Sequence, residues 1–220
     1  PSSAASDVYK RQTTYSDESL PEWTCHVGIA TEKNGRWRRT MEDAHLYLQD
    51  FNNVPGQGYF AIFDGHAGKF AAEWCRDNMN RILSEELNVC PHMDVREVMR
   101  NAFLKADEQL EAESRSAGVR SGCTAVTSLI RLESDDSDQN KSRRRVLYTA
   151  NVGDARSVLW YVDTSVCRLQ LLTMNASRGG KAIRLTYDHK GSDEFESKRI
   201  TEKGGFLLNN RVNGACNLCV

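Results

Sequence analysis

The sequence predicts an α+β fold in which helices pack on antiparallel sheets. Short apolar runs of strand length, bounded by glycine and other turn residues, occur early in the chain and again in its middle. Between them lie two successive stretches in which apolar residues recur at helical spacing. Strand runs that are interrupted by a pair of helices are typical of a layered α+β domain.

Length, charge and cysteine content narrow the class of protein. The 220 residues allow one domain of ordinary size or two small ones. A formal net charge of −1 argues against binding to nucleic acid or membrane through bulk charge, so we expect neither as a partner. The seven cysteines are irregularly spaced, which favours free thiols in a reducing compartment such as the cytoplasm. The basic run 143–145 leaves a nuclear location open, although a solvated loop is the simpler interpretation.

The first regular element is expected some way into the chain. Residues 1–22 are polar and small and show no periodicity, so we expect a disordered or non-native leader. The apolar run 59–63 precedes Asp64 and Gly65, which predicts a buried strand that enters a tight turn.

Two helices are expected after this strand. Apolar residues recur at helical spacing over 71–83, which predicts the first helix. Asp94 followed by Glu97 is a capping-box pattern, and it opens a second helix with an apolar face over 95–110.

The middle of the chain is rich in predicted strands. Residues 123–132 are apolar on both faces, as in a central strand, and residues 146–151 and 155–161 predict two more strands. Residues 133–145 are acidic and then basic, which predicts a solvated hairpin loop. Residues 181–186 predict a returning strand.

The last part of the chain is harder to interpret. Residues 162–178 fit either a long loop after a strand or an insertion. A final helix is predicted between Ser192 as its N-cap and Gly204 as its stop. Residues 206–210 indicate a strand and a hairpin turn.

Two clusters carry the residue types of a metal site. Adjacent Glu42 and Asp43 offer hard oxygen ligands, although such a charged pair is usually a solvated surface feature. Asp64 lies at the end of a buried strand, and Gly65 allows a backbone carbonyl to approach a ligand closely. His66 adds an imidazole, a group that can donate or accept a proton. These groups suit a hard divalent ion with bound water, whereas a helix cap with a chance histidine is the competing interpretation.

The order and spacing of several motifs are more informative than any one of them. In chain order the sequence contains Arg-x-x-Met-Glu-Asp at 38–43, Phe-Asp-Gly-His-x-Gly at 63–68, Ser-Gly-Cys-Thr-Ala at 121–125, Ala-Asn-x-Gly-Asp-x-Arg at 150–156, Leu-Thr-x-Asp-His-Lys at 185–190 and Arg-Val-Asn-Gly at 211–214. This series resembles the metal-dependent protein serine/threonine phosphatases of type 2C, and in particular their small single-domain fungal members.

The resemblance implies a sandwich of two antiparallel β-sheets flanked by antiparallel helix pairs, with a centre of two Mg²⁺ or Mn²⁺ ions at one end. In that pattern Asp64 bridges both ions and the carbonyl of Gly65 binds one of them. Glu42 supports the same ion, Asp43 supports the metal-bound waters, and Asp154 matches an acid tied to a weaker third ion.

The resemblance also implies the catalytic residues. Arg38 matches the arginine that binds the substrate phosphate, and His66 matches the residue that protonates the leaving oxygen. The implied activity is hydrolysis of phosphoserine and phosphothreonine in proteins by metal-activated water. The implied partners are phosphorylated protein substrates, with protein kinases as further candidates, and the implied state is a monomer.

The chain departs from the family pattern at its end. Residues 23–214 match the N-terminal part of the family domain, whereas residues 215–220 read as a tail outside the pattern. The later aspartate motifs, which supply ligands of the other ion, do not follow, so we expect a domain that is incomplete at the C-terminus. We accordingly expect a weakly active or inactive form, and the alternative is a non-catalytic fragment that binds phosphoproteins.

Overall fold

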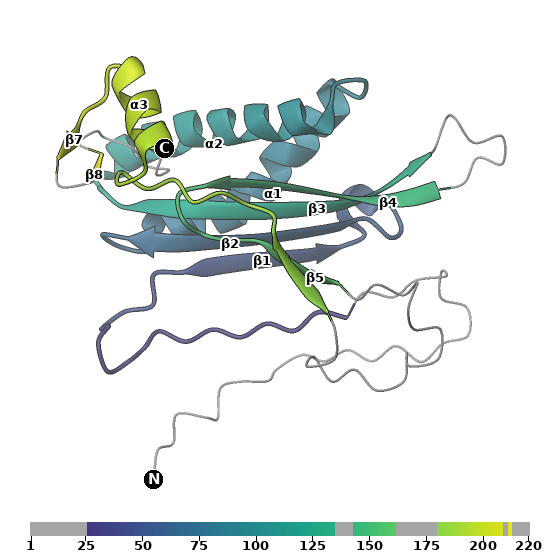
Figure 1. The fold of residues 1–220 in the computed structure, drawn as a ribbon, viewed down its shortest axis with the longest axis horizontal. Helices are drawn as coiled ribbons and strands as arrows, with labels where there is room; N and C mark the ends of the chain where they lie inside the picture. The colour runs from purple at the N-terminus through teal and green to yellow at the C-terminus, as the bar shows by residue number, and fades with distance from the viewer. Residues whose placement is uncertain (1–25, 135–142, 162–179, 209–210, 213–220) are drawn as a thin grey trace, which may run out of the picture.

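The protein is described by a computed structural model, which covers residues 26–134, 143–161, 180–208 and 211–212 (Figure 1). The elements in chain order are β1 (Ala44–Gln49), the 3₁₀ helix η1 (Phe51–Asn53), β2 (Gly58–His66), α1 (Phe70–Val89), α2 (Val95–Ala117), β3 (Gly122–Ser134), β4 (Arg143–Val152), β5 (Val158–Tyr161), β6 (Lys181–Arg184), α3 (Glu194–Glu202), β7 (Leu207–Leu208) and β8 (Arg211–Val212). The predicted α+β class is confirmed. The predicted leader, the stretch 162–178 and the tail 215–220 lie outside the described residues.

Four antiparallel strands form the main sheet, in the order β1-β2-β3-β4. A separate hairpin pairs β5 with β6, and a short one pairs β7 with β8. The ladder between β2 and β3 continues to the end of β2, where Asp64 pairs with Thr124 and Gly65 with Cys123. The end of β2 is therefore held in place by a neighbouring central strand.

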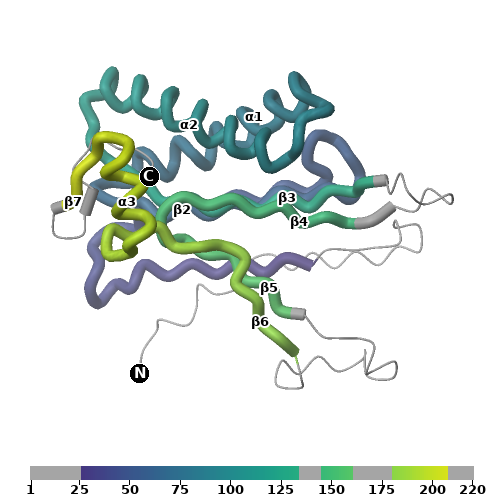
Figure 2. The backbone as a smooth tube through the Cα atoms, turned by 45° about the horizontal axis from the view of Figure 1, so that its top comes forward, coloured from purple at the N-terminus to yellow at the C-terminus, as the bar shows by residue number. Residues whose placement is uncertain are grey.

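The main sheet has a helical side and an open side. Helices α1 and α2 cover one face, whereas the β5–β6 hairpin lies on the other side (Figure 2). Alternation along β2 explains this arrangement, because Tyr59, Ala61 and Phe63 join the core under the helices. Their neighbours Ile62 and Asp64 are exposed on the opposite side. The sheet thus presents the side chain of Asp64 away from the helices.

The second predicted helix is confirmed together with its cap. The Asp94 side chain accepts a hydrogen bond from the Arg96 backbone N–H at 2.8 Å, which satisfies one of the free donors at the start of α2. The helix ends at Gly118, whose φ of 66° is the left-handed conformation that glycine adopts at no steric cost. None of the described helices is long and apolar enough to cross a membrane.

Several predicted boundaries needed correction. β3 and β4 extend into the predicted loop 133–145, because their ladder continues through the pairs of Leu132 with Arg145 and Glu133 with Arg144. β5 begins only at Val158, since the preceding residues form the turn that contains Asp154. Asp193, rather than Ser192, caps α3: its side chain accepts a hydrogen bond from the Glu196 N–H.

Candidate metal centre

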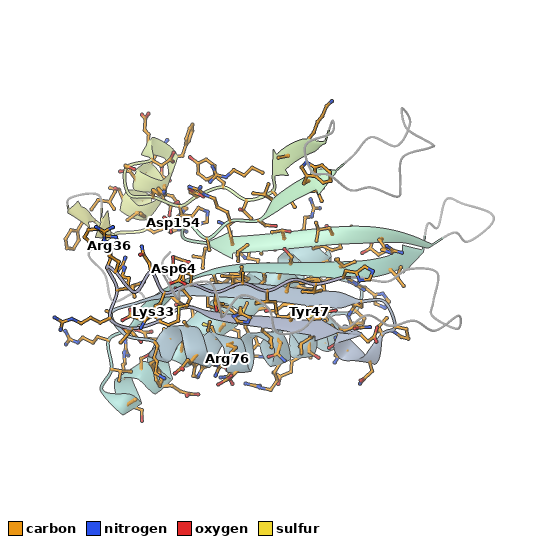
Figure 3. The ribbon with its side chains drawn as sticks, turned by 90° about the horizontal axis from the view of Figure 1, so that it is seen from below. Lys33, Arg36, Tyr47, Asp64, Arg76 and Asp154 are labelled. Atoms are coloured by element: carbon orange, nitrogen blue, oxygen red, sulfur yellow. The ribbon has the colours of Figure 1, made fainter. Side chains whose placement is uncertain are left out.

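Three carboxylates gather at the end of β2. The pKa of Asp64 is raised above its ordinary value, first by partial desolvation of its carboxylate and then by the nearby carboxylates of Asp43 and Asp154. A hydrogen bond between the Asp43 and Asp64 side chains raises it further, while His66 lowers it. Figure 3 shows Asp64 and Asp154 at the same end of the molecule. The fold thus brings four of the sequence-predicted residues together.

Glu42 joins the segment before β1 to the turn after β2. Its Oε2 accepts a hydrogen bond from the Gly68 N–H at 3.2 Å, and its Oε1 accepts one from the Thr40 hydroxyl at 3.1 Å. The Gly68 φ of 115° lies in the region that favours glycine, so the turn has little freedom to accept another residue there. Gly65 lies against the backbone of Glu42, which places these two predicted metal ligands side by side.

The loop that carries Asp154 is fixed by β3 and by the segment after β6. Gly153 has a φ of 83°, and a Cβ on it would lie 2.6 Å from Thr124 Cγ2, so only glycine fits there. The Gly153 carbonyl accepts a hydrogen bond from the His189 N–H at 2.9 Å, and the Gly153 N–H donates to His189 Nδ1 at 3.3 Å. Lys190 Nζ lies 3.4 Å from the Asp154 carboxylate.

Asp188 accepts hydrogen bonds from two arginines near the loop that carries Asp154. The Arg156 guanidinium donates to both of its oxygens, at 2.9 Å and 2.6 Å, and Arg184 donates to it as well. These hydrogen bonds, the Arg156 ones foremost, hold the pKa of Asp188 well below its usual range. The pair joins the segment between β4 and β5 to the segment after β6. Sequence reasoning missed it, although both residues belong to quoted motifs.

The two predicted catalytic residues occupy different positions. His66 is exposed at the end of β2 and contributes to the electrostatics of Asp64. Arg38 is exposed in the segment before β1, where its backbone N–H donates to the Asn34 carbonyl at 3.0 Å. Among the described residues, no hydrogen bond or ion pair joins the Arg38 side chain to the acids of the centre.

Comparison with known proteins identifies the family of this chain. The sequence profile described as Protein phosphatase 2C matches residues 27–219. The chain belongs to the protein phosphatase 2C family.

Two yeast members of the protein phosphatase 2C family illustrate the relationship. Protein phosphatase 2C homolog 1 of Saccharomyces cerevisiae is 41% identical over 196 residues, which cover 87% of this chain and 63% of the relative. Protein phosphatase 2C homolog 1 of Schizosaccharomyces pombe is 40% identical over 188 residues, covering 86% of this chain and 47% of the relative. The chain therefore spans less than two thirds of the length of either protein.

Solved structures of lower identity share the fold. The crystal structure of the serine-threonine phosphatase 2C from Toxoplasma gondii matches with a TM-score of 0.60 at 21% identity, covering 88% of this chain and 61% of that chain. A sex-determining protein of Caenorhabditis elegans matches with a TM-score of 0.57 at 24% identity, covering 82% of this chain and 40% of that chain. At these identities the matches establish a protein phosphatase 2C-like fold alone.

The donor set of the candidate centre suits the metals of this metal-dependent family. Asp43, Asp64 and Asp154 offer only oxygen, which Mg²⁺ and Mn²⁺ prefer. Like charges raise the pKa of Asp64, so a bound cation would relieve a repulsion that is already present. Within the described ranges, however, no group of three or more histidine, cysteine or acidic side chains lies close enough to hold an ion directly. Water and carbonyl ligands would have to complete the shell, as Mg²⁺ commonly allows.

Proposed function

We propose that this chain forms part of a metal-dependent phosphatase that hydrolyses phosphoserine and phosphothreonine in proteins. The observation that carries the proposal is the convergence of Asp43 and Asp154 on Asp64, at a strand end fixed by the ladder between β2 and β3. A rigid strand end is a suitable place for charges that must keep a productive geometry.

Each residue then has a defined task. Asp64, the Gly65 carbonyl and Glu42 would hold the divalent ions, and Asp43 would orient the water that they bind. When bound, Mg²⁺ or Mn²⁺ neutralises the phosphate and acidifies a water molecule. Asp154 would serve a further, more weakly bound ion.

Two residues act on the substrate itself. Arg38 binds two phosphate oxygens through its planar guanidinium, a geometry that lysine does not offer. His66 donates a proton to the serine or threonine oxygen as it leaves. The exposure of His66 at the end of β2 supports this role, because a protein substrate must reach it from solvent.

We also propose that the main sheet is one layer of a two-sheet sandwich. On its open face the rings of Tyr47 and Phe60 stack with their centroids 5.0 Å apart, and the neighbouring Ile62 is 52% exposed. An apolar sheet face is normally covered by a second layer. The position of the β5–β6 hairpin on that side supports the arrangement (Figure 2).

A second candidate function is binding of phosphoproteins without turnover. The observation that favours it is the lack, within the described part of the chain, of three clustered side-chain ligands for a metal. Phosphate recognition by Arg38 would persist in such a protein, whereas hydrolysis would be weak or absent.

Titration with Mn²⁺, followed by calorimetry, tests the metal centre. We expect the wild-type chain to take up Mn²⁺ and Asp64→Asn to lose that uptake. Asp77→Asn is the matched control, because Asp77 is an exposed aspartate on α1 that forms an ion pair with its neighbour Arg76. Equal Mn²⁺ uptake by the wild type and Asp64→Asn would show that Asp64 does not bind the metal.

Hydrolysis of a phosphoserine peptide in the presence of Mn²⁺ separates the two functions. Turnover that disappears in Asp64→Asn supports the phosphatase. Binding of the peptide without turnover, and equally by the wild type and Asp64→Asn, favours the binding protein.

A further inference from the structure

An exposed, strongly basic turn precedes the candidate metal centre. Residues 33–39, here called the basic turn, include Lys33, Arg36, Arg38 and Arg39 and no acidic residue, and all of them are exposed. We propose that the basic turn recognises acidic residues next to the phosphorylated serine or threonine of a protein substrate. This inference rests on the proposed phosphatase function and adds a preference among its substrates.

Backbone hydrogen bonds hold the basic turn in one shape. The N–H groups of Trp37 and Arg38 both donate to the Asn34 carbonyl, at 2.8 Å and 3.0 Å. The Asn34 N–H donates to the Glu32 carboxylate at 2.8 Å, and Asn34 adopts the left-handed conformation that asparagine tolerates. A turn that is ordered before binding loses less conformational entropy when a ligand arrives.

The side chains of the turn form a surface suited to binding. Trp37 is 73% exposed, and the Arg36 guanidinium carbon lies 5.1 Å from the centre of its ring, a cation–π contact. The Lys33 side chain folds back over the turn. Its Cε lies 3.4 Å from the position that a Cβ on Gly35 would occupy. An exposed tryptophan with neighbouring cations is typical of sites that bind proteins.

The basic turn lies beside the candidate centre. Figure 3 shows Lys33 and Arg36 at the same end of the molecule as Asp64 and Asp154, whereas Tyr47 lies farther along the sheet. The chain leads directly from the basic turn to Glu42. A hydrogen bond from the Gly68 N–H holds the Glu42 side chain against the turn that follows β2. A peptide whose phosphate reaches the centre would therefore pass over the basic turn.

Charge complementarity identifies the kind of ligand. One arginine, Arg38, suffices for the phosphate, which leaves three cations for other groups. Within the described part of the chain, no carboxylate forms an ion pair with Lys33, Arg36 or Arg39. Acidic side chains that flank the phosphorylated residue would be attracted to these exposed cations, and salt would screen that attraction.

A nucleic acid fits this surface less well. Its phosphates repeat along the whole strand, and several of them would meet the carboxylates of Asp43, Asp64 and Asp154. The formal net charge of −1 also gives no general attraction for a polyanion. A short peptide with a few carboxylates avoids this repulsion.

Fluorescence anisotropy with two phosphoserine peptides tests the proposal, one with glutamates and one with glutamines around the phosphoserine. With the wild-type chain, Mn²⁺ and low salt, we expect the glutamate peptide to bind about tenfold more tightly, because two or more exposed ion pairs add to its affinity. Raising the salt concentration should reduce this difference. Equal affinity for the two peptides would overturn the proposal.

Variants assign the preference to the basic turn. The double variant Lys33→Ala with Arg36→Ala should lose the preference, whereas Lys33→Arg with Arg36→Lys should keep it because the charge remains. The double variant Arg81→Ala with Arg100→Ala removes the same charge from exposed positions on α1 and α2 and should behave as the wild type. A preference that survives in the first double variant would contradict the assignment.

Two further comparisons separate this proposal from its alternatives. If the unphosphorylated glutamate peptide binds as tightly as the phosphorylated one, the phosphatase proposal fails while acid recognition by the basic turn is supported. If a single-stranded oligonucleotide displaces the glutamate peptide at lower concentration than the unlabelled peptide does, the turn is a nucleic-acid site and the proposal is wrong.

Discussion

Gly65 packs directly against Glu42: a Cβ placed on Gly65 would lie 2.2 Å from the Glu42 backbone oxygen and 3.0 Å from its carbonyl carbon. Both of these Glu42 atoms belong to the backbone, which cannot rotate away as the end of a side chain can. The same Cβ would also lie 3.2 Å from Ala72 Cβ in α1. The segment before β1, the end of β2 and the start of α1 therefore meet at one glycine.

We expect Gly65→Ala to be destabilising, because its methyl group forces the backbone of Glu42 to move. Overpacked sites of this kind commonly cost about 1–3 kcal/mol of unfolding free energy. Urea denaturation followed by circular dichroism would measure the loss. Gly28→Ala is the matched control, since nothing lies within 4 Å of a Cβ there, and it should change the free energy by no more than about 0.5 kcal/mol. Similar effects of both substitutions would contradict the close contact.

The cap of α2 should make stability depend on pH in the acid range. Hydrogen bonds from Arg96, mainly from its guanidinium and then from its backbone, lower the pKa of Asp94 to about 2. The unfolded value is about 3.9, so the folded protein binds fewer protons and the Asp94 contribution is complete above that value. It is lost as the pH falls from about 4 towards 2.

Melting temperatures over this pH range, recorded for Asp94→Ala and Asp94→Ser, test the cap. Alanine removes the cap and should lower the melting temperature at neutral pH, whereas serine keeps a capping oxygen and should lower it less. Both variants should show a shallower fall below pH 4 than the wild type, because the titrating group is gone. A fall as steep as that of the wild type in both variants would assign the acid dependence to other groups.

Two buried thiols should be protected from alkylation. Cys75 on α1 and Cys123 on β3 are both fully buried, with their sulfurs 3.7 Å apart. The hydrogen bond to Cys75 and burial raise the pKa of Cys123, so its reactive thiolate is scarce. Partly exposed Cys90 should therefore react with iodoacetamide before either of these two cysteines under native conditions.

Peptide mass mapping after a short pulse of iodoacetamide would rank the three sites. In urea, all three cysteines should react at similar rates, which serves as the control. Labelling of Cys123 as fast as Cys90 in the native protein would show that the start of β3 opens readily.

Local patterns predicted much of the fold, and contacts distant in sequence decided the rest. The periodicity over 95–110 and the capping residue Asp94 lie within one element, so the second helix could be predicted with its start. The prediction of β2 stopped at residue 63, because the pairing that extends the strand to His66 comes from β3. Ser192 and Asp193 are both suitable caps, and sequence preference alone does not choose between neighbours.

The candidate site, like the fold, could be predicted from the sequence only in part. The order of the motifs singled out Asp64, Asp43 and Asp154, and the structure brings these acids within electrostatic reach of one another. The pairing of Arg156 with Asp188 depends on how two distant loops fold together, and no spacing in the sequence indicates it. The role of Arg38 as phosphate ligand stays a prediction from the family pattern.

The ion pair between Arg156 and Asp188 affects where the protein can tolerate insertions and deletions. It closes the base of the β5–β6 hairpin, together with the hydrogen bond from the Leu185 N–H to the Ser157 carbonyl at 2.9 Å. The clasp lies next to the paired ends Val158 and Arg184, on the side of the turn that contains Asp154, so it holds that turn whatever the length of chain between the two strands. Evolution can therefore vary the segment between Tyr161 and Lys181 in length without rebuilding the acidic centre, which makes it a natural place for species-specific additions.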